Sequence, residues 1–306
     1  MPSESDEAVG APAIGRVVTA MVTPFDGDAA LDLDGAARLA SHLLDHGTET
    51  VLVNGTTGES PTLHADEPWQ LLTTVREAVG DRATVMVGTG TNDTAKTVAA
   101  TERASKEGAD AVLVVTPYYN RPDQRGLAAH FRSVAEATDL PVLLYDIPGR
   151  TGREIATSTL VELAGIDNIV GVKDATGDCG KAGDVLRATR DAPGGFGLWS
   201  GADEVNLPLL ALGGRGVVSV SSHLVGDEIA EMIEVFATDP VRARELHLAC
   251  LPVHRALFAE PSPAPLKGAL TALGLPGGPV RPPLANASEA VVGAVLEALR
   301  ELQAQR

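Results

Sequence analysis

The sequence predicts an α/β protein, a closed (β/α)8 TIM barrel with a C-terminal helical extension. Eight short apolar segments rich in β-branched residues read as strands, at 16–22, 50–54, 84–88, 110–116, 141–146, 168–173, 196–200 and 216–220. Stretches with helical spacing separate them, and this alternation indicates parallel strands joined by crossover helices. Eight such units in roughly 220 residues favour a closed barrel over an open doubly wound sheet.

The expected helices follow the same periodicity. Those of the barrel lie at 34–46, 66–79, 94–107, 126–137, 157–163, 180–190 and 204–212, and those of the extension at 227–237, 240–258, 264–273 and 288–304. A proline-rich turn near residues 277–283 separates the last two. We therefore divide the chain into a flexible N-terminus (1–13), a catalytic barrel (14–225) and a C-terminal helical region (226–306).

Composition excludes several classes of protein. A formal net charge of -17 over 306 residues argues against nucleic acid as a partner, because little here would neutralise a phosphate backbone. The first residues lack the basic region and apolar core of a signal peptide, and no apolar run approaches membrane-spanning length, so we expect a cytoplasmic protein without membrane contact. Cys179 and Cys250 are isolated cysteines, which we expect to be reduced.

Lys173 is the candidate for amine chemistry. It ends the apolar segment 168–173, and catalytic groups in this fold collect at the C-terminal ends of the strands. The chain has only five lysines, and the other four lie in polar or helix-like sequence. Burial lowers the pKa of a lysine, and the neutral amine can attack a carbonyl to form a Schiff base.

Other polar groups occupy the equivalent ends of neighbouring strands. Tyr145 ends the strand before Lys173 and could shuttle a proton, although a tyrosine there could equally cap the barrel core. Thr56 and Thr57, flanked by glycines, could hold a carboxylate or simply form a tight turn. Arg150 follows a Pro-Gly bend and could grip a second carboxylate, or be a solvated surface arginine.

A metal site is not expected. His223 is the single histidine near a strand end, and the strand-end acids have no paired spacing: Glu59, Asp146, Asp174 and Asp203.

Three motifs together carry a family resemblance. They are Gly-Thr-Thr-Gly-Glu-Ser at 55–60, Tyr145 with Pro148 and Arg-Thr-Gly at 150–152, and Gly-Val-Lys-Asp-Ala-Thr-Gly at 171–177. In this order they resemble the dihydrodipicolinate synthase and N-acetylneuraminate lyase superfamily of pyruvate-dependent class I aldolases, from about residue 14 to the C-terminus. The run 115–122 with Arg150 resembles the branch that condenses pyruvate with L-aspartate 4-semialdehyde to 4-hydroxy-tetrahydrodipicolinate, in lysine and diaminopimelate biosynthesis.

The resemblance implies roles for the catalytic residues. Lys173 would form the Schiff base with pyruvate, so that no cofactor is needed. Tyr145 would be the proton donor and acceptor, and Thr56 with Tyr119 would complete a proton relay. In this family the residue matching Tyr119 reaches into the neighbouring subunit's site, which implies a homo-oligomer, usually a tetramer built as a dimer of dimers.

The resemblance also implies the substrate contacts. Thr57 and the backbone of Val218 would hold pyruvate, and Arg150 the carboxylate of aspartate semialdehyde. The chain departs from the common pattern at three positions near the mouth: Asp146, Ala202 and His223. It departs again where some members bind an inhibitory lysine through histidines and a glutamate, since it has Ala65, Pro68 and Lys96 there. Lysine inhibition should therefore be weak or absent.

Two alternatives stay open from sequence. One is another pyruvate aldolase or lyase, acting on a 2-keto-3-deoxy sugar acid or 4-hydroxy-2-oxoglutarate, because related folds switch substrate. The other is a non-catalytic keto-acid sensor, which would need a carboxylate grip but no proton relay.

Overall fold

The eight predicted strands form a closed parallel barrel. The computed structural model describes residues 14–304, so the segment 1–13 lies outside the described residues. Each strand pairs with the next, and β1 pairs with β8. The strands are β1 (Val17–Ala20), β2 (Thr50–Val53), β3 (Thr84–Gly88), β4 (Ala111–Val115), β5 (Val142–Asp146), β6 (Ile169–Asp174), β7 (Gly197–Ser200) and β8 (Gly216–Ser219). The predicted fold class is confirmed.

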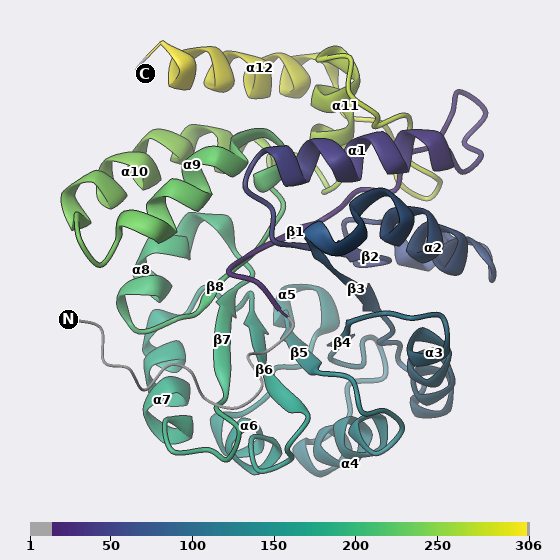
Figure 1. Cartoon of the computed structure of the whole chain (residues 1–306), viewed down its shortest axis with the longest axis vertical. Coiled ribbons are helices and arrows are strands. Elements are labelled where there is room, and N and C mark those ends of the chain that lie inside the picture. The colour runs from purple at the N-terminus through teal and green to yellow at the C-terminus, as the bar shows by residue number, and fades with distance from the viewer. Residues whose placement is uncertain (1–13, 305–306) are drawn as a thin grey trace.

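Helices surround the barrel as predicted (Figure 1). They are α1 (Leu33–Asp45), α2 (Glu67–Val79), α3 (Thr94–Lys106), α4 (Gln124–Ala135), α6 (Thr157–Leu163), α7 (Cys179–Thr189) and α8 (Asn206–Ala211). Aspartate side chains cap four of them by accepting backbone N–H groups: Asp32, Asp93, Asp123 and Asp178. The sequence patterns did not indicate the short helix α5 (Pro148–Thr151).

Four further helices form the C-terminal region, α9 (Ser222–Val235), α10 (Pro240–Ala256), α11 (Ala264–Ala272) and α12 (Glu289–Gln303). Figure 1 shows them gathered on one side of the barrel, beside α1. Helix α9 begins earlier than the predicted residue 227, because its first turn precedes a kink at Val225. None of the helices within 14–304 is long and apolar enough to cross a membrane.

The interior of the barrel is filled by side chains. Its buried cluster comprises Ile14, Val18, Ala20, Leu52, Met86, Ala111, Leu113, Leu143, Tyr145, Trp199 and Val218. The indole of Trp199 donates a hydrogen bond to the carbonyl of Gly15 at 2.9 Å, next to the N-terminal ends of the strands. The polar side chains that could take part in catalysis therefore lie at the opposite, C-terminal end of the barrel.

Candidate active site

Lys173 and Tyr145 lie directly opposite each other in the register of β5 and β6. The lysine Nζ is 4.2 Å from the centre of the tyrosine ring, and the lysine is 4% exposed. Gly201 leaves room for the lysine stem, because a Cβ there would lie 2.9 Å from the lysine Cε. Burial lowers the pKa of Lys173 to about 8; the carboxylate of Asp203 opposes this shift. About a tenth of the amine is therefore neutral at pH 7, against less than about a thousandth for an ordinary lysine.

Tyr145 connects the lysine to the loop after β2. The side chain of Thr56 faces its hydroxyl. Burial raises the pKa of Tyr145 to about 12, against the opposing influence of this threonine. The phenol is thus protonated at neutral pH and can donate a proton. The backbone carbonyl of Tyr145 accepts hydrogen bonds from both the backbone N–H and the hydroxyl of Thr116, each at 2.9 Å. These bonds fix the end of β5.

The loop after β2, residues 55–59, is the threonine loop. Asn54 before it and Glu59 at its end both have left-handed backbone, with φ of 55° and 57°. The hydroxyl of Thr23 donates to the carbonyl of Gly58 at 2.6 Å. Thr57 is buried within the loop.

A cavity of about 690 Å³ opens at the C-terminal ends of β2 to β5. We call it the mouth cavity; its lining includes Thr56, Tyr118, Tyr119, Arg121 and Arg150. Arg150 lies on α5 and is exposed, with its guanidinium free to meet an anion in solution. The structure thus gathers Thr56, Tyr119 and Arg150 around one hollow.

Tyr119 lines this cavity from an unusual backbone. Its φ is 71° and its side chain is 89% exposed. Left-handed backbone is rare for an aromatic residue and is typical of sites where the fold imposes a conformation. Cross-links hold the loop, because Arg121 Nε donates to the carbonyl of Gly152 at 2.9 Å and Arg153 Nη2 donates to the carbonyl of Arg121 at 3.1 Å.

The predicted substrate contact Val218 is buried within β8, in the same interior cluster as Tyr145. Only its backbone was expected to face a substrate, and β8 ends one residue later at Ser219.

This arrangement was compared with known proteins. The model of the dihydrodipicolinate synthetase family matches residues 13–302. The chain belongs to this family.

Individual relatives agree with the family over nearly the whole chain. A 4-hydroxy-tetrahydrodipicolinate synthase of Moorella thermoacetica is 48% identical, covering 94% of this chain and 98% of that protein. One of Acidothermus cellulolyticus is 52% identical, covering 92% and 91%. The crystal structure of the Cyanidioschyzon merolae enzyme with lysine bound superposes with a TM-score of 0.92 at 41% identity, covering 96% of this chain and 99% of that one.

Asp146, one of the positions at which the sequence was expected to depart from the common family pattern, has a clear structural partner. Asp146 is buried and lies 2.7 Å from Lys181 Nζ, which is also 2.7 Å from Glu154. Burial would lower the pKa of Lys181, but these two carboxylates raise it above its usual value. Asp146 also accepts the backbone N–H of Ile155, so it ties down the far end of the segment that carries Arg150.

Two strand-end residues that had no assigned role prove to be anchors. The buried carboxylate of Asp203 accepts the backbone N–H groups of Val220 and Ser221, at 3.1 and 2.9 Å. His223 donates from Nδ1 to the carbonyl of Val220 and accepts the N–H of Val22 at Nε2, and burial lowers its pKa to about 4. His223 is therefore a neutral cross-link between β1 and β8.

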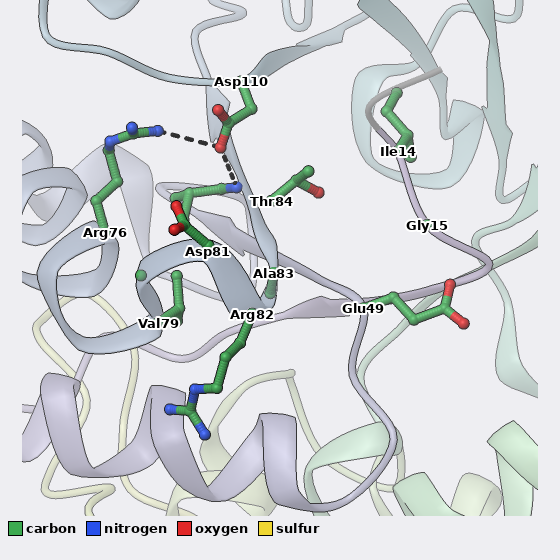
Figure 2. A pocket seen from close by; sticks show the side chains of 12 residues that line it. Ile14, Gly15, Glu49, Arg76, Val79, Asp81, Arg82, Ala83, Thr84 and Asp110 are labelled. Atoms are coloured by element: carbon green, nitrogen blue, oxygen red, sulfur yellow. Dashed lines mark hydrogen bonds and ion pairs between the residues drawn. The ribbon is translucent and has the colours of Figure 1, made fainter. Parts of the chain in front are cut away.

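A second cavity, of about 510 Å³, lies at the opposite end of the strands (Figure 2). Figure 2 shows Arg76 and Asp110 pointing toward each other, and they form an ion pair at 3.1 Å. Asp110 also accepts the backbone N–H of Val85 at 2.7 Å. The ion pair and the hydrogen bond hold together the N-terminal ends of β3 and β4. None of the predicted catalytic residues lines this cavity.

Proposed function

We propose that this protein is a lyase that condenses pyruvate with L-aspartate 4-semialdehyde to give 4-hydroxy-tetrahydrodipicolinate, the entry reaction of lysine and diaminopimelate biosynthesis. The observation that carries the proposal is the buried amine of Lys173 beside a protonated Tyr145 whose hydroxyl faces Thr56. The names of the full-length relatives support the same reaction.

The first half of the reaction follows from these groups. The carboxylate of pyruvate binds at the threonine loop, through Thr57, and at the backbone of Val218. Lys173 Nζ attacks the carbonyl carbon, and the carbinolamine loses water as Tyr145 delivers a proton to the departing oxygen. That proton leaves with the water, and Thr56 and Tyr119 supply Tyr145 with another along the relay. The protonated imine withdraws electrons from the neighbouring methyl group, so no metal or cofactor is needed for this step.

The second half forms the carbon–carbon bond. The methyl carbon loses a proton to give an enamine, which attacks the aldehyde carbon of the semialdehyde. Arg150 grips the carboxylate of that substrate at the mouth cavity. The substrate's own amino group then attacks the imine carbon and displaces Lys173, which closes the ring of the product and restores the free amine.

Arg150 also helps to decide between aspartate semialdehyde and a sugar acid as the substrate. A sugar acid offers hydroxyl groups where aspartate semialdehyde offers a second carboxylate, and a guanidinium matches the carboxylate. No specific observation favours the alternative, and we do not propose it.

The mode of assembly is part of the proposal. An exposed Tyr119 held in left-handed backbone fits a residue that completes a neighbouring subunit's site, in a dimer that pairs into a tetramer. Mixing Lys173→Ala with Tyr119→Phe subunits tests this. A hybrid dimer regains activity if Tyr119 acts across the interface and stays inactive if it acts within its own subunit. Both cysteines are free, which agrees with the cytoplasm as the proposed compartment.

Borohydride trapping tests the reaction directly. Intact mass and peptide mapping after treatment with pyruvate should place one adduct on Lys173, with turnover when aspartate semialdehyde is added. Lys173→Ala should give neither, and the exposed Lys96→Ala should behave as the wild type. An adduct without turnover would redirect the proposal to another aldolase, and a folded protein without an adduct would refute the Schiff base.

A further inference from the structure

Glu59 and Lys267 form a buried ion pair that the reaction proposed above does not use. Their side chains are 0% and 1% exposed, and Lys267 Nζ lies 2.7 Å from Glu59 Oε1. Glu59 ends the threonine loop, whereas Lys267 belongs to α11 in the C-terminal region. Removing two charges from water is unfavourable, and a hydrophobic pair of similar volume is often at least as stable. The pair therefore calls for a reason other than stability.

The other hydrogen bonds of the two charged groups lead to the segment beside the threonine loop on one side and to Arg281 on the other. Lys267 Nζ donates to the carbonyl of Thr23 at 2.9 Å, and the hydroxyl of Thr23 donates in turn to the carbonyl of Gly58. Glu59 Oε2 accepts the backbone N–H of Arg281 at 2.8 Å. The C-terminal region is thus bonded directly to the end of the threonine loop.

Arg281 holds the residues that follow this loop. Its guanidinium forms a two-point ion pair with Glu67, at 2.6 and 2.7 Å, and donates to the carbonyl of Thr62 at 3.0 Å. The cationic groups of Arg281 and Lys267 each lie 4.1 Å from the centre of the Phe25 ring. Two cations from the C-terminal region thus fix the chain on both sides of η1 (Ser60–Thr62).

The backbone at Glu59 shows what these bonds impose. Its φ of 57° is left-handed, which is unfavourable for glutamate and persists only where the surroundings determine it. Glu59 N donates to the carbonyl of Thr56 at 3.1 Å, so the left-handed residue closes the turn that presents the two threonines. Release of the Glu59 side chain would remove the bonds that join this turn to the C-terminal region.

We propose that Glu59, Lys267 and Arg281 are positioning residues for catalysis, through which the C-terminal region sets the geometry of Thr56 and Thr57. The inference rests on the proposed function, because it assigns the loop to pyruvate binding and proton relay. Displacing a catalytic group by about 1 Å can lower a rate about 100-fold. The role therefore predicts a loss of rate in protein that remains folded.

The test compares Glu59→Gln, Lys267→Met and the double variant, with the exposed C-terminal Glu231→Gln as control. The rate of pyruvate adduct formation on Lys173 is measured alongside kcat, KM and Tm. Each single variant leaves one buried charge unpaired and should lower Tm. The double variant removes both charges and should regain Tm, yet it should still form the adduct at least tenfold more slowly than wild type, with a raised KM for pyruvate. The control should match wild type.

A double variant with wild-type Tm, adduct rate and KM would overturn the proposal, because the pair would then serve the fold alone. Glu67→Gln weakens the ion pair with Arg281 but keeps a side-chain oxygen for the backbone N–H of His64, so it provides a milder variant, expected to slow the adduct severalfold without a change of fold. An unchanged rate there would refute the part assigned to Arg281. Because the adduct assay uses pyruvate alone, a wrong second substrate would abolish turnover in wild type and leave this readout intact.

Discussion

Lys173 and Lys267 are both almost fully buried, at 4% and 1% exposure, but only Lys267 is ion-paired. The amine of Lys173 forms no hydrogen bond or ion pair with any residue that the structure describes, and faces the ring of Tyr145 instead. Burial lowers the pKa of both amines to about 8, and a carboxylate opposes the shift in each case. The difference between them is geometric, because the Lys267 amine is engaged by Glu59 and by the carbonyl of Thr23, whereas the Lys173 amine is left available to a substrate.

The pH dependence of imine formation should report the pKa of Lys173. Because burial lowers this pKa to about 8, the neutral fraction should rise about tenfold per pH unit below pH 8 and level off above it. Quenching pyruvate reactions with borohydride at short times, between pH 6 and 10, measures the rate. A rate that kept climbing to pH 10, as for an ordinary lysine, would contradict the interpretation.

Tyr145→Phe should separate packing from proton transfer. The ring remains in the interior cluster, so Tm should change little, while the hydroxyl that faces Thr56 is lost. We expect kcat to fall by about 100-fold to 1,000-fold, the usual effect of a lost general acid. Thr56→Val should cause a comparable loss. If the two act in one relay, the double variant should be little worse than either single variant; fully multiplicative losses would speak against the relay.

Most of the barrel could be predicted because its strands are buried on both faces. Such strands are short apolar runs between turn residues; seven of the eight predicted ranges contain a whole strand of the structure, and the range 168–173 misses only the last residue of β6. Lys173 and Tyr145 were placed together correctly because neighbouring strand ends meet at one edge of a barrel. That reasoning needs only the order of the strands.

The rest depended on contacts between distant segments. Lys267 lies in helix-like sequence, and only tertiary packing shows that it meets Glu59, 208 residues away. A signal was present nonetheless, since Lys267 is the lone charged residue between Pro261 and Val280. The helix α5 spans four residues, too few for a periodic pattern, and the left-handed backbone at Glu59 has no signature in sequence.

Lys173→Met should stabilise the protein near neutral pH. The folded-state pKa of about 8 lies below the ordinary 10.5, so the unfolded chain binds more protons between these values and stability rises with pH across that window. At pH 7 the wild type bears a penalty of about 3 kcal/mol that the neutral methionine avoids. Chemical denaturation at pH 7 and above 10.5 measures the difference, which should shrink at the higher pH. Lys96→Met, at an exposed site, should change stability by less than about 0.5 kcal/mol. Equal stability of wild type and Lys173→Met at pH 7 would disprove the buried-charge argument.

Free lysine should inhibit this protein weakly or not at all. Where some family members bind lysine through histidines and a glutamate, this chain has Ala65, Pro68 and Lys96. The Lys96 side chain is 77% exposed and only loosely paired with Asp93, at 3.8 Å, so its ammonium would repel that of the ligand. The measurement is the initial rate at saturating substrates, with lysine added up to about 1 mM, a concentration at which even weak binding would be detected. Lys96→Glu replaces repulsion with attraction and should bind lysine more tightly than wild type in calorimetry. Strong inhibition of the wild type at sub-millimolar lysine would mean that the ligand is held by groups other than those at these three positions.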